Sequence, residues 1–444
     1  MKKSKNLIAW FYIVAVAVVI PVFNRGTFDN ITQHKVEVYY LIAGISFALY
    51  LILSVISDFG FSKVEASSDS FISLKGDRAT IAACGFGIAV VLSFLLSEYK
   101  KDAFYGVPGF GMGTLSLVVM LISAFFISRE FVCSEVIYHI VAAGSVIPTI
   151  LVIANRLGYD PLGFYAGGIA PQYNLYVSTF GNYGWFCEYM SLIFPILIYM
   201  VVKGRNFIVK GIYVAYLALS LWAIFLAGTI AIWLSIGVVI ATLVVSGVFK
   251  RLPFWEKSTR HVRPFVTMLS VLAFIGYVCM ILFVSSRDGA GNGRGYIWNL
   301  SLETYRNLSL KDKFFGVGPN CYMHAVNSFL ESDPYVKLEA VNNFEGLAIT
   351  SAHSEYLDYL VNMGIVGAAS YLCMIFAIVI GVFRNKRETK DAYAGGLSDE
   401  TYVAFLCVLS YLFYAGFNFS IVCATPLFLC SWGFCGEAQG YMIL

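Results

Sequence analysis

Apolar runs of about 20 residues recur along the whole chain, and they constrain its fold more than any other feature. A helical run of this length crosses the hydrocarbon core of a bilayer. The chain is 59% hydrophobic and only 13% charged, too apolar for a water-soluble surface. We therefore predict an all-α polytopic membrane protein with about 12 transmembrane helices. The predicted spans are 7–23, 36–57, 79–97, 112–128, 136–154, 183–202, 207–227, 229–249, 265–285, 354–382, 402–422 and 425–443.

The distribution of basic residues predicts how the chain is oriented. An even number of spans puts both termini on one side, and most of the 30 lysines and arginines fall in loops on that side. Cytoplasmic loops are enriched in these residues, so both termini are predicted to be cytoplasmic. The chain then divides into spans 1–9 (residues 1–285), one long external polar loop (286–352) and spans 10–12 (353–444).

The first part of the long loop has the pattern of an amphipathic helix that lies at the membrane interface. Residues 293–306 place Trp298, Leu302 and Tyr305 on one face, and Arg294 begins the helix. In one interpretation, Arg294 binds a phosphate or pyrophosphate together with the exposed N–H groups of the first turn. In the other, it is an ordinary interfacial arginine that extends towards lipid headgroups.

His353 closes the loop at the beginning of the tenth span. The positive end of the helix dipole disfavours an imidazolium, so we expect this histidine to be largely neutral. It could then accept a proton from a sugar hydroxyl. The alternative is a histidine that only forms hydrogen bonds within the loop.

Four further positions are candidates for substrate binding. The stretch Phe180-Gly-Asn-Tyr-Gly184 opens the sixth span, where Gly181 and Asn182 would let a bulky headgroup approach the backbone. Lys35 enters the second span and Arg287 lies in the long loop, so either could contact an anion. Lys35 also fits an interfacial anchor. The sequence has no clustered metal ligands and no phosphate-binding glycine-rich motif, so we expect neither a metal nor a cofactor, and nothing indicates nucleic-acid binding.

Taken in order, these features resemble the bacterial O-antigen ligase and O-antigen polymerase superfamily of membrane glycosyltransferases. The Gly-Asn-Tyr-Gly stretch is similar to the Gly-Asn-x-Asn region of that family. Arg294-Gly-Tyr-Ile-Trp298 and Phe315-Gly-Val-Gly-Pro319 resemble its Arg-x-x-x-Trp and Gly-x-Gly-Pro signatures. Ala352-His-Ser-Glu-Tyr-Leu357 and Met363-Gly-Ile-Val-Gly367 resemble its His-Asn-x-Tyr-Leu and Gly-Ile-x-Gly motifs. The resemblance extends over residues 180–370.

The resemblance implies an enzyme of surface polysaccharide biosynthesis in the bacterial cytoplasmic membrane. Such an enzyme transfers an oligosaccharide from undecaprenyl pyrophosphate to a sugar hydroxyl on a glycan or glycolipid acceptor, without a metal. It acts as a repeat-unit polymerase or as a ligase. By resemblance, Arg294 would neutralise the pyrophosphate leaving group, His353 would activate or orient the hydroxyl, and Trp298 would help to form the donor site.

The chain departs from the family pattern at the start of span eight. The family usually has Ser-Arg-Gly there, whereas this chain has Ile230 or a near neighbour in place of the arginine. Either Lys35, Arg25 or Arg287 supplies the missing charge, or the enzyme is an altered variant.

A second departure is Ser354, which follows the histidine where the family commonly has asparagine. Functions of other classes are a transporter or flippase of lipid-linked glycans, and a scaffold protein of an envelope-assembly complex. A transporter should show repeated halves with polar groups near the middle of the membrane. Here the recognisable polar groups gather at one face, which favours an enzyme.

Overall fold

The computed structural model describes residues 2–25, 31–59, 78–163, 178–204, 206–250, 293–344, 348–384 and 399–435, with residues 276, 279, 280 and 283. Within these residues every regular element is a helix, which confirms the all-α class. The first half contains α1 (Lys2–Val14), η1 (Ala15–Val19), α2 (Ile20–Val22), α3 (Ile31–Phe59), α4 (Arg78–Leu96), α5 (Lys100–Tyr105), α6 (Thr114–Glu130), α7 (Glu135–Arg156), η3 (Ser178–Phe180), α8 (Tyr183–Lys203), α9 (Phe207–Ala227) and α10 (Ile230–Lys250). The second half contains α12 (Arg294–Asn307), α13 (Leu310–Phe315), α14 (Tyr322–Ser332), α15 (Pro334–Phe344), α16 (Glu355–Arg384), α17 (Asp399–Ala415) and α18 (Thr425–Cys435).

Seven of the described helices are long and apolar enough to cross a membrane. They are Ser4–Val22, Ile31–Ile56, Arg78–Leu96, Glu135–Arg156, Tyr183–Lys203, Phe207–Ala227 and Glu355–Ile380. Shorter apolar helices cover Ile230–Val244 and Tyr402–Ala415. The protein is therefore a multi-pass membrane protein, but the predicted count of about 12 spans is not confirmed. Most of the predicted ninth span, 265–285, lies outside the described residues.

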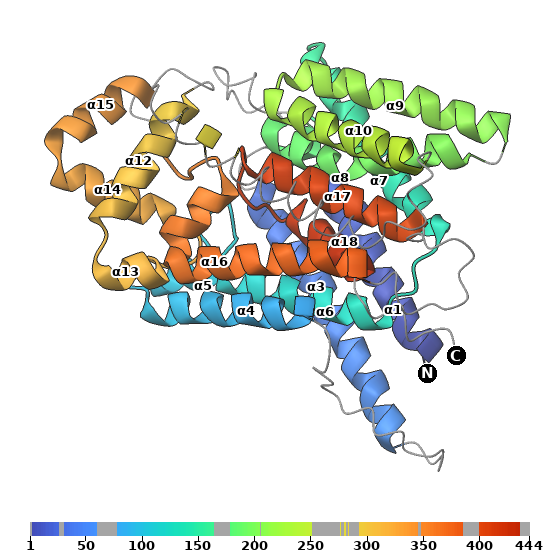
Figure 1. Ribbon diagram of the computed structural model, residues 1–444, viewed down its shortest axis with the longest axis horizontal. Coiled ribbons are helices and arrows are strands. Elements are labelled where there is room, and N and C mark those ends of the chain that lie inside the picture. The colour runs from blue at the N-terminus through green and yellow to red at the C-terminus, as the bar shows by residue number, and fades with distance from the viewer. Residues whose placement is uncertain are drawn as a thin grey trace.

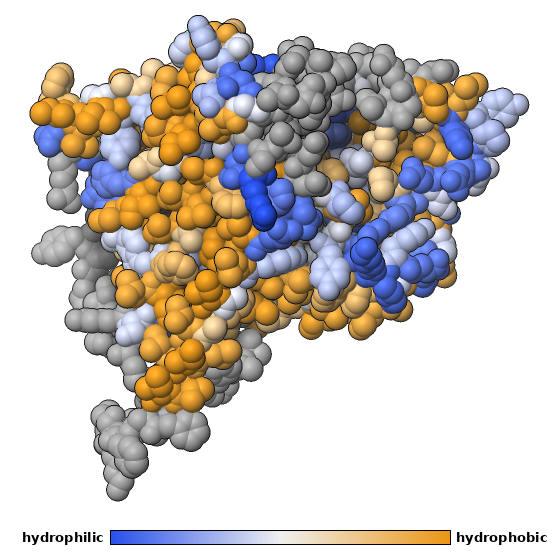
Figure 2. Space-filling view, turned by 180° about the vertical axis from the view of Figure 1, so that it is seen from behind, coloured by the Kyte–Doolittle hydropathy of each residue, from blue (hydrophilic) through white to orange (hydrophobic). Residues whose placement is uncertain are grey.

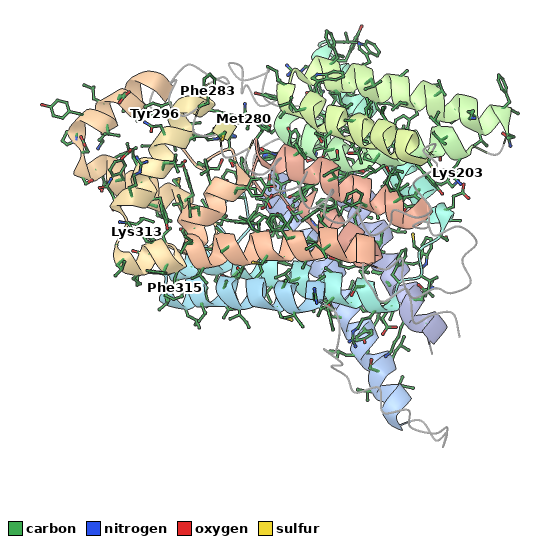
Figure 3. The ribbon with its side chains drawn as sticks, in the orientation of Figure 1. Lys203, Met280, Phe283, Tyr296, Lys313 and Phe315 are labelled. Atoms are coloured by element: carbon green, nitrogen blue, oxygen red, sulfur yellow. The ribbon has the colours of Figure 1, made fainter. Side chains whose placement is uncertain are left out.

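The helices form one bundle with a separate group of helices at one end. In Figure 1, α4, α6 and α16 lie along one side of the bundle, where α4 packs against both α16 and α6, and α9 and α10 cover the other side. The helices α12 to α15 stand at the end remote from the start of α1. Lys203, at the end of α8, and Tyr296, in α12, lie at opposite ends of the molecule (Figure 3). Seen from behind, hydrophilic side chains gather towards the α12–α15 end (Figure 2).

The seventh and eighth predicted spans are two separate helices joined by a tight turn. Gly228 ends α9 in a left-handed conformation (φ 73°), and α10 begins two residues later at Ile230. A left-handed glycine is a common way to end a helix, because it has no Cβ to clash with the backbone.

The described part of the long loop, 293–344 and 348–352, is itself largely helical. As predicted, a helix begins at Arg294. The prediction that Trp298 faces the membrane interface is wrong, because its side chain is only 1% exposed; the position of the helix at the interface stays a prediction. Trp298 belongs to a second apolar core, which α12 shares with α14 and the start of α16. A stripe of apolar residues indicates that one face is covered, but it does not tell whether lipid or protein covers it.

Two of the glycine-containing motifs, residues 315–319 and 363–367, pack against each other and hold the α12–α15 group on the bundle. The N–H groups of Val317 and Gly318 donate to the carbonyl oxygens of Val361 and Asn362, at 3.3 and 2.9 Å. Gly364 interrupts the helical geometry of α16 (φ 64°), and a Cβ there would collide with the backbone of the 314–315 segment. Glycine is required because the two backbones meet at this point.

The predicted eleventh span, 402–422, is wrong at its C-terminal part. The helix α17 ends at Ala415, residues 416–424 form a loop, and α18 begins at Thr425. Almost the whole loop is buried. Within a bilayer, non-helical backbone is tolerated only where protein covers it, and protein covers this loop.

Candidate functional site

Arg294 is the first residue of α12, and its side chain reaches the loop between α17 and α18. Its Nη2 donates to the carbonyl oxygen of Phe417 at 3.2 Å. The preceding residue, Gly293, is left-handed (φ 82°) and provides no side-chain cap. The first N–H groups of a helix have no partners within the helix. Together with a guanidinium, they can bind a phosphate group.

His353 lies just before α16, which begins at Glu355, rather than in its first turn. Its backbone is left-handed (φ 48°), a conformation that is uncommon for residues other than glycine. The Asp358 carboxylate accepts a hydrogen bond from the N–H of Ala352 at 2.8 Å, and the Ser351 hydroxyl accepts one from the N–H of His353 at 3.4 Å. These bonds hold the histidine in its unusual geometry, as is often found at functional sites.

The imidazole of His353 is held in its neutral form. Burial, and secondarily the positive charge of Arg294, lower the pKa of His353 from 6.5 to about 4. The direction of this shift agrees with the expected neutral histidine, but its main cause is burial and not the helix dipole. A neutral imidazole can accept a hydrogen bond from a hydroxyl group.

The loop between α17 and α18 brings these two side chains together. The carbonyl of Phe417 accepts the hydrogen bond of Arg294, and two residues later the ring of Phe419 lies 5.6 Å from the ring of His353. Arg294 and His353 thus contact the same short segment, although Arg294 opens α12 and His353 precedes α16.

Asn418, between these two phenylalanines, contacts a buried acid. Its Nδ2 donates to the carboxylate of Glu188 in α8. A second buried acid, Glu355, accepts hydrogen bonds from the hydroxyls of Tyr371 and, at 2.9 Å, of Tyr411. Neither acid forms an ion pair within the part of the chain that the structure describes. Acids within membrane helices are costly to bury and commonly mark functional sites.

The start of α8 lies beside the same loop. Asn182 caps the helix, and its Oδ1 accepts a hydrogen bond from the N–H of Gly184 at 2.7 Å. The hydroxyl of Tyr414, in α17, donates to the carbonyl of Gly184 at 2.8 Å. Gly181 is left-handed (φ 78°). The geometry explains why this stretch has these residues, and a contact of Gly181 and Asn182 with substrate stays a prediction.

Arg156, at the end of α7, is a cation that the sequence reading did not single out. Its Nη2 lies 3.5 Å from the carbonyl oxygen of Ala227, at the turn between α9 and α10. The guanidinium carbon lies 5.7 Å from the centre of the Tyr183 ring, at the start of α8. Its buried Nε has no hydrogen-bond partner among the described residues. Arg156 therefore stands beside the position where the resemblance leads us to expect an arginine.

Lys35 lies elsewhere and has a different environment from the one expected. It is buried, and its Nζ donates to the carbonyl oxygens of Ile20, Pro21 and Phe23 at 2.6, 3.3 and 2.7 Å. An ammonium group has three N–H donors, and these three carbonyls account for all of them. The geometry favours a cap on the end of α2, and does not support the predicted contact with an anion.

The remaining predicted positions are distributed as follows. The side chain of Ile230 is 78% exposed on the outside of the bundle, so an arginine at this position would face the bilayer rather than the site. Arg25 is exposed. Arg287 lies outside the described residues. Trp298 is buried with its ring 6.1 Å from that of Phe417, which suits a support for Phe417 better than a surface for substrate.

Asn418, Glu188 and Arg156 were missed for identifiable reasons. Glu188 is an acid within an apolar run, which by itself is a signal of function in a membrane helix. Asn418 falls in Gly416-Phe-Asn-Phe-Ser420, whose small and polar residues within a predicted span indicate a break. Arg156 has no sequence neighbour that distinguishes it from an ordinary loop arginine.

Comparison with known proteins agrees with the motifs. Residues 215–372 match the family model described as O-antigen ligase. The matched segment is just over a third of the chain and includes both Arg294 and His353. No curated protein matches the chain. The match confirms the resemblance to the O-antigen ligase and polymerase superfamily over this part of the chain, and it supports a role of this type in surface polysaccharide biosynthesis.

Proposed function

We propose that this protein transfers an oligosaccharide from undecaprenyl pyrophosphate to an acceptor hydroxyl, because residues 215–372 match the O-antigen ligase family model. The reaction takes place at the membrane face that carries α12–α15, as repeat-unit polymerisation or as ligation to a terminal glycolipid. One observation carries the proposal: the arginine at the start of α12 and a neutral histidine both contact residues 417–419. Both termini are then cytoplasmic, and α12–α15 lie outside the cytoplasmic membrane.

The reaction forms one bond and breaks one. The acceptor oxygen bonds to C1 of the donor sugar while the bond from C1 to the phosphate oxygen breaks. The hydroxyl proton passes to His353, and the lipid pyrophosphate leaves with the negative charge. Arg294 and the N–H groups at the start of α12 stabilise that charge. A preorganised group of this kind contributes roughly 3 kcal/mol in a site that excludes water.

Binding of the donor also prepares His353 to accept the proton. Part of the reason for the low pKa of His353 is the positive charge of Arg294. A pyrophosphate bound to Arg294 offsets this charge, so it raises the pKa of His353 towards the ordinary range. The histidine becomes a better base only when the donor is present, and a general base is most effective when its pKa lies near the working pH.

Arg156 is the best-placed candidate for the second cation of the site. It lies between the start of α8 and the turn before α10, and its Nε has no hydrogen-bond partner among the described residues. A pyrophosphate has two phosphate groups, and a planar guanidinium can bind one of them through two hydrogen bonds. In this proposal Arg156 supplies from α7 the charge that is missing at the start of α10.

The test is to reconstitute the purified protein with an undecaprenyl-pyrophosphate oligosaccharide and to separate the products by size. A ladder of products indicates a polymerase, and a single shift that requires a second glycolipid indicates a ligase. Arg294→Ala and His353→Ala should each abolish transfer while the protein still inserts into the membrane. Transport of the intact donor without any product would overturn the proposal in favour of a flippase.

A further inference from the structure

A polar groove runs along α12, beginning one turn after Arg294. Asn299, Glu303 and Asn307 follow one another at intervals of four residues, so their side chains lie along one face of the helix. Asn299 and Glu303 line a cavity of about 480 Å³. Asn307 lines this cavity and a neighbouring one of about 300 Å³.

The two cavities form one groove because they share a wall. Asn307, Phe329 and Ser332 line both of them. The side opposite α12 is formed by the end of α14 and by α15, whose Glu339 also lines the larger cavity. The hydroxyl of Tyr296 reaches towards the carbonyl oxygen of Val336, at 3.5 Å, across the end of the groove nearest Arg294. In Figure 3, Tyr296 lies at the end of the molecule that carries α12–α15.

The lining of the groove has the chemistry that binds sugars. Amide and hydroxyl groups can donate to and accept from sugar hydroxyls, and the half-buried ring of Phe329 offers a flat apolar surface for the C–H groups of a sugar ring. The cavity volumes lie in the range of small-molecule binding sites, roughly 300–1,000 Å³.

The charge of the groove is negative. Its lining includes five carboxylates and one lysine, Lys311. Lys311 is already close to two of the carboxylates, Glu98 at 3.6 Å and Asp312 at 3.3 Å. Glu303 pairs with the exposed Arg306 at 2.6 Å, outside the lining. Glu339 has no such ion pair among the described residues, and Asp333 accepts hydrogen bonds from backbone N–H groups of α15. The excess of negative charge repels anionic sugars.

We infer that this groove binds the sugars of the donor oligosaccharide beyond the reacting one, and that it selects uncharged or amino sugars over uronic acids. The inference rests on the proposed function, because Arg294, which would bind the pyrophosphate, begins the helix that forms the groove. A glycan attached to that pyrophosphate can extend along α12 past Asn299 and Glu303.

The experiment measures binding of free tetrasaccharides to the detergent-purified protein by saturation-transfer NMR. The probes are cellotetraose (neutral), chitosan tetrasaccharide (amino) and tetragalacturonate (acidic). The neutral and amino probes should bind, and the acidic probe should bind more weakly. Glu303→Gln combined with Glu339→Gln should strengthen binding of tetragalacturonate, by roughly threefold for each carboxylate after screening by salt. Asn299→Ala should weaken binding of every probe by roughly fivefold, as expected for the loss of a hydrogen bond.

The matched control is Glu331→Gln, which removes an exposed carboxylate of α14 that lines neither cavity. It should leave the binding of all three probes unchanged. The inference is overturned if no probe binds, if tetragalacturonate binds best to the unaltered protein, or if the groove variants behave like the control. The probes contain no pyrophosphate, so Arg294→Ala and His353→Ala should bind them normally. A result in which the groove binds no sugar is thereby distinguished from failure of the proposed transfer reaction, which those two variants test.

Discussion

At donor concentrations far below KM, transfer by this protein should be nearly insensitive to mild acid, because His353 of the free enzyme stays neutral there. With a pKa of about 4, His353 is about 97% neutral at pH of about 5.5. An ordinary histidine, with a pKa of about 6.5, would be only about 9% neutral at the same pH. Between pH of about 7.5 and 5.5, kcat/KM should therefore fall by less than about 5%, whereas an ordinary histidine would give a loss of about tenfold.

The assay is the initial rate of glycan transfer in detergent, with the donor at a concentration far below its KM. Thermal unfolding at each pH serves as the control for loss of folded protein. The profile of kcat/KM reports the free enzyme and that of kcat reports the enzyme with bound donor. Because the donor offsets the charge of Arg294, the acidic midpoint of kcat should lie above that of kcat/KM. A midpoint of kcat/KM near 6.5 would refute the burial argument, and identical midpoints would refute the coupling between Arg294 and His353.

Three further substitutions distinguish residues of the site from residues of the frame. Arg156→Ala should lower kcat/KM for the lipid-pyrophosphate donor by roughly tenfold to a hundredfold, as expected for the loss of a charged hydrogen bond. Arg156→Lys should retain much of the activity. An unchanged kcat/KM for the alanine variant excludes Arg156 from the site. Lys35→Met should lower the melting temperature, because three carbonyl groups, two of them buried, lose their hydrogen-bond donor. It should leave kcat/KM unchanged at temperatures where the protein is folded, and a weaker affinity for the lipid-linked oligosaccharide would restore Lys35 to the site. Gly318→Ala should destabilise the protein by roughly 1–3 kcal/mol in a thermal-unfolding measurement, because φ of Gly318 is 127° and a Cβ there would collide with Ser97. In the same measurement Gly211→Ala should have no such effect, because no atom lies near the position of its Cβ.

The positions of most helices could be predicted because the bilayer leaves the chain so few alternatives. A buried backbone in hydrocarbon must form its hydrogen bonds within a helix, so an apolar run of sufficient length is enough to predict one. The predicted span 136–154 corresponds to Glu135–Arg156, and 183–202 corresponds to Tyr183–Lys203. The end of α17 could not be predicted in this way, because a hydropathy average over residues 402–422 conceals the break after Ala415.

The candidate site was predicted only where a residue stands at the beginning of a helix. Arg294 and His353 each precede or open an apolar pattern, so their places in the fold follow from local sequence. The residues that join them, Phe417 and Phe419, come from a distant part of the chain. Asn418, between these two, pairs with Glu188, which lies 230 positions away. Nothing in a single sequence relates such a pair. Trp298 was misplaced for a related reason, because helical periodicity does not distinguish a protein core from lipid.

The loop between α17 and α18 also has a consequence for the order in which the enzyme is made. A ribosome synthesises Arg294 and His353 more than sixty residues before it reaches Phe417 and Phe419, the residues that contact both side chains. Segments nearer the N-terminus are released and fold first. A nascent chain that has already inserted Arg294 and His353 therefore still lacks the segment that contacts them. In the proposed mechanism, a copy that ends before residue 417 cannot carry out the transfer.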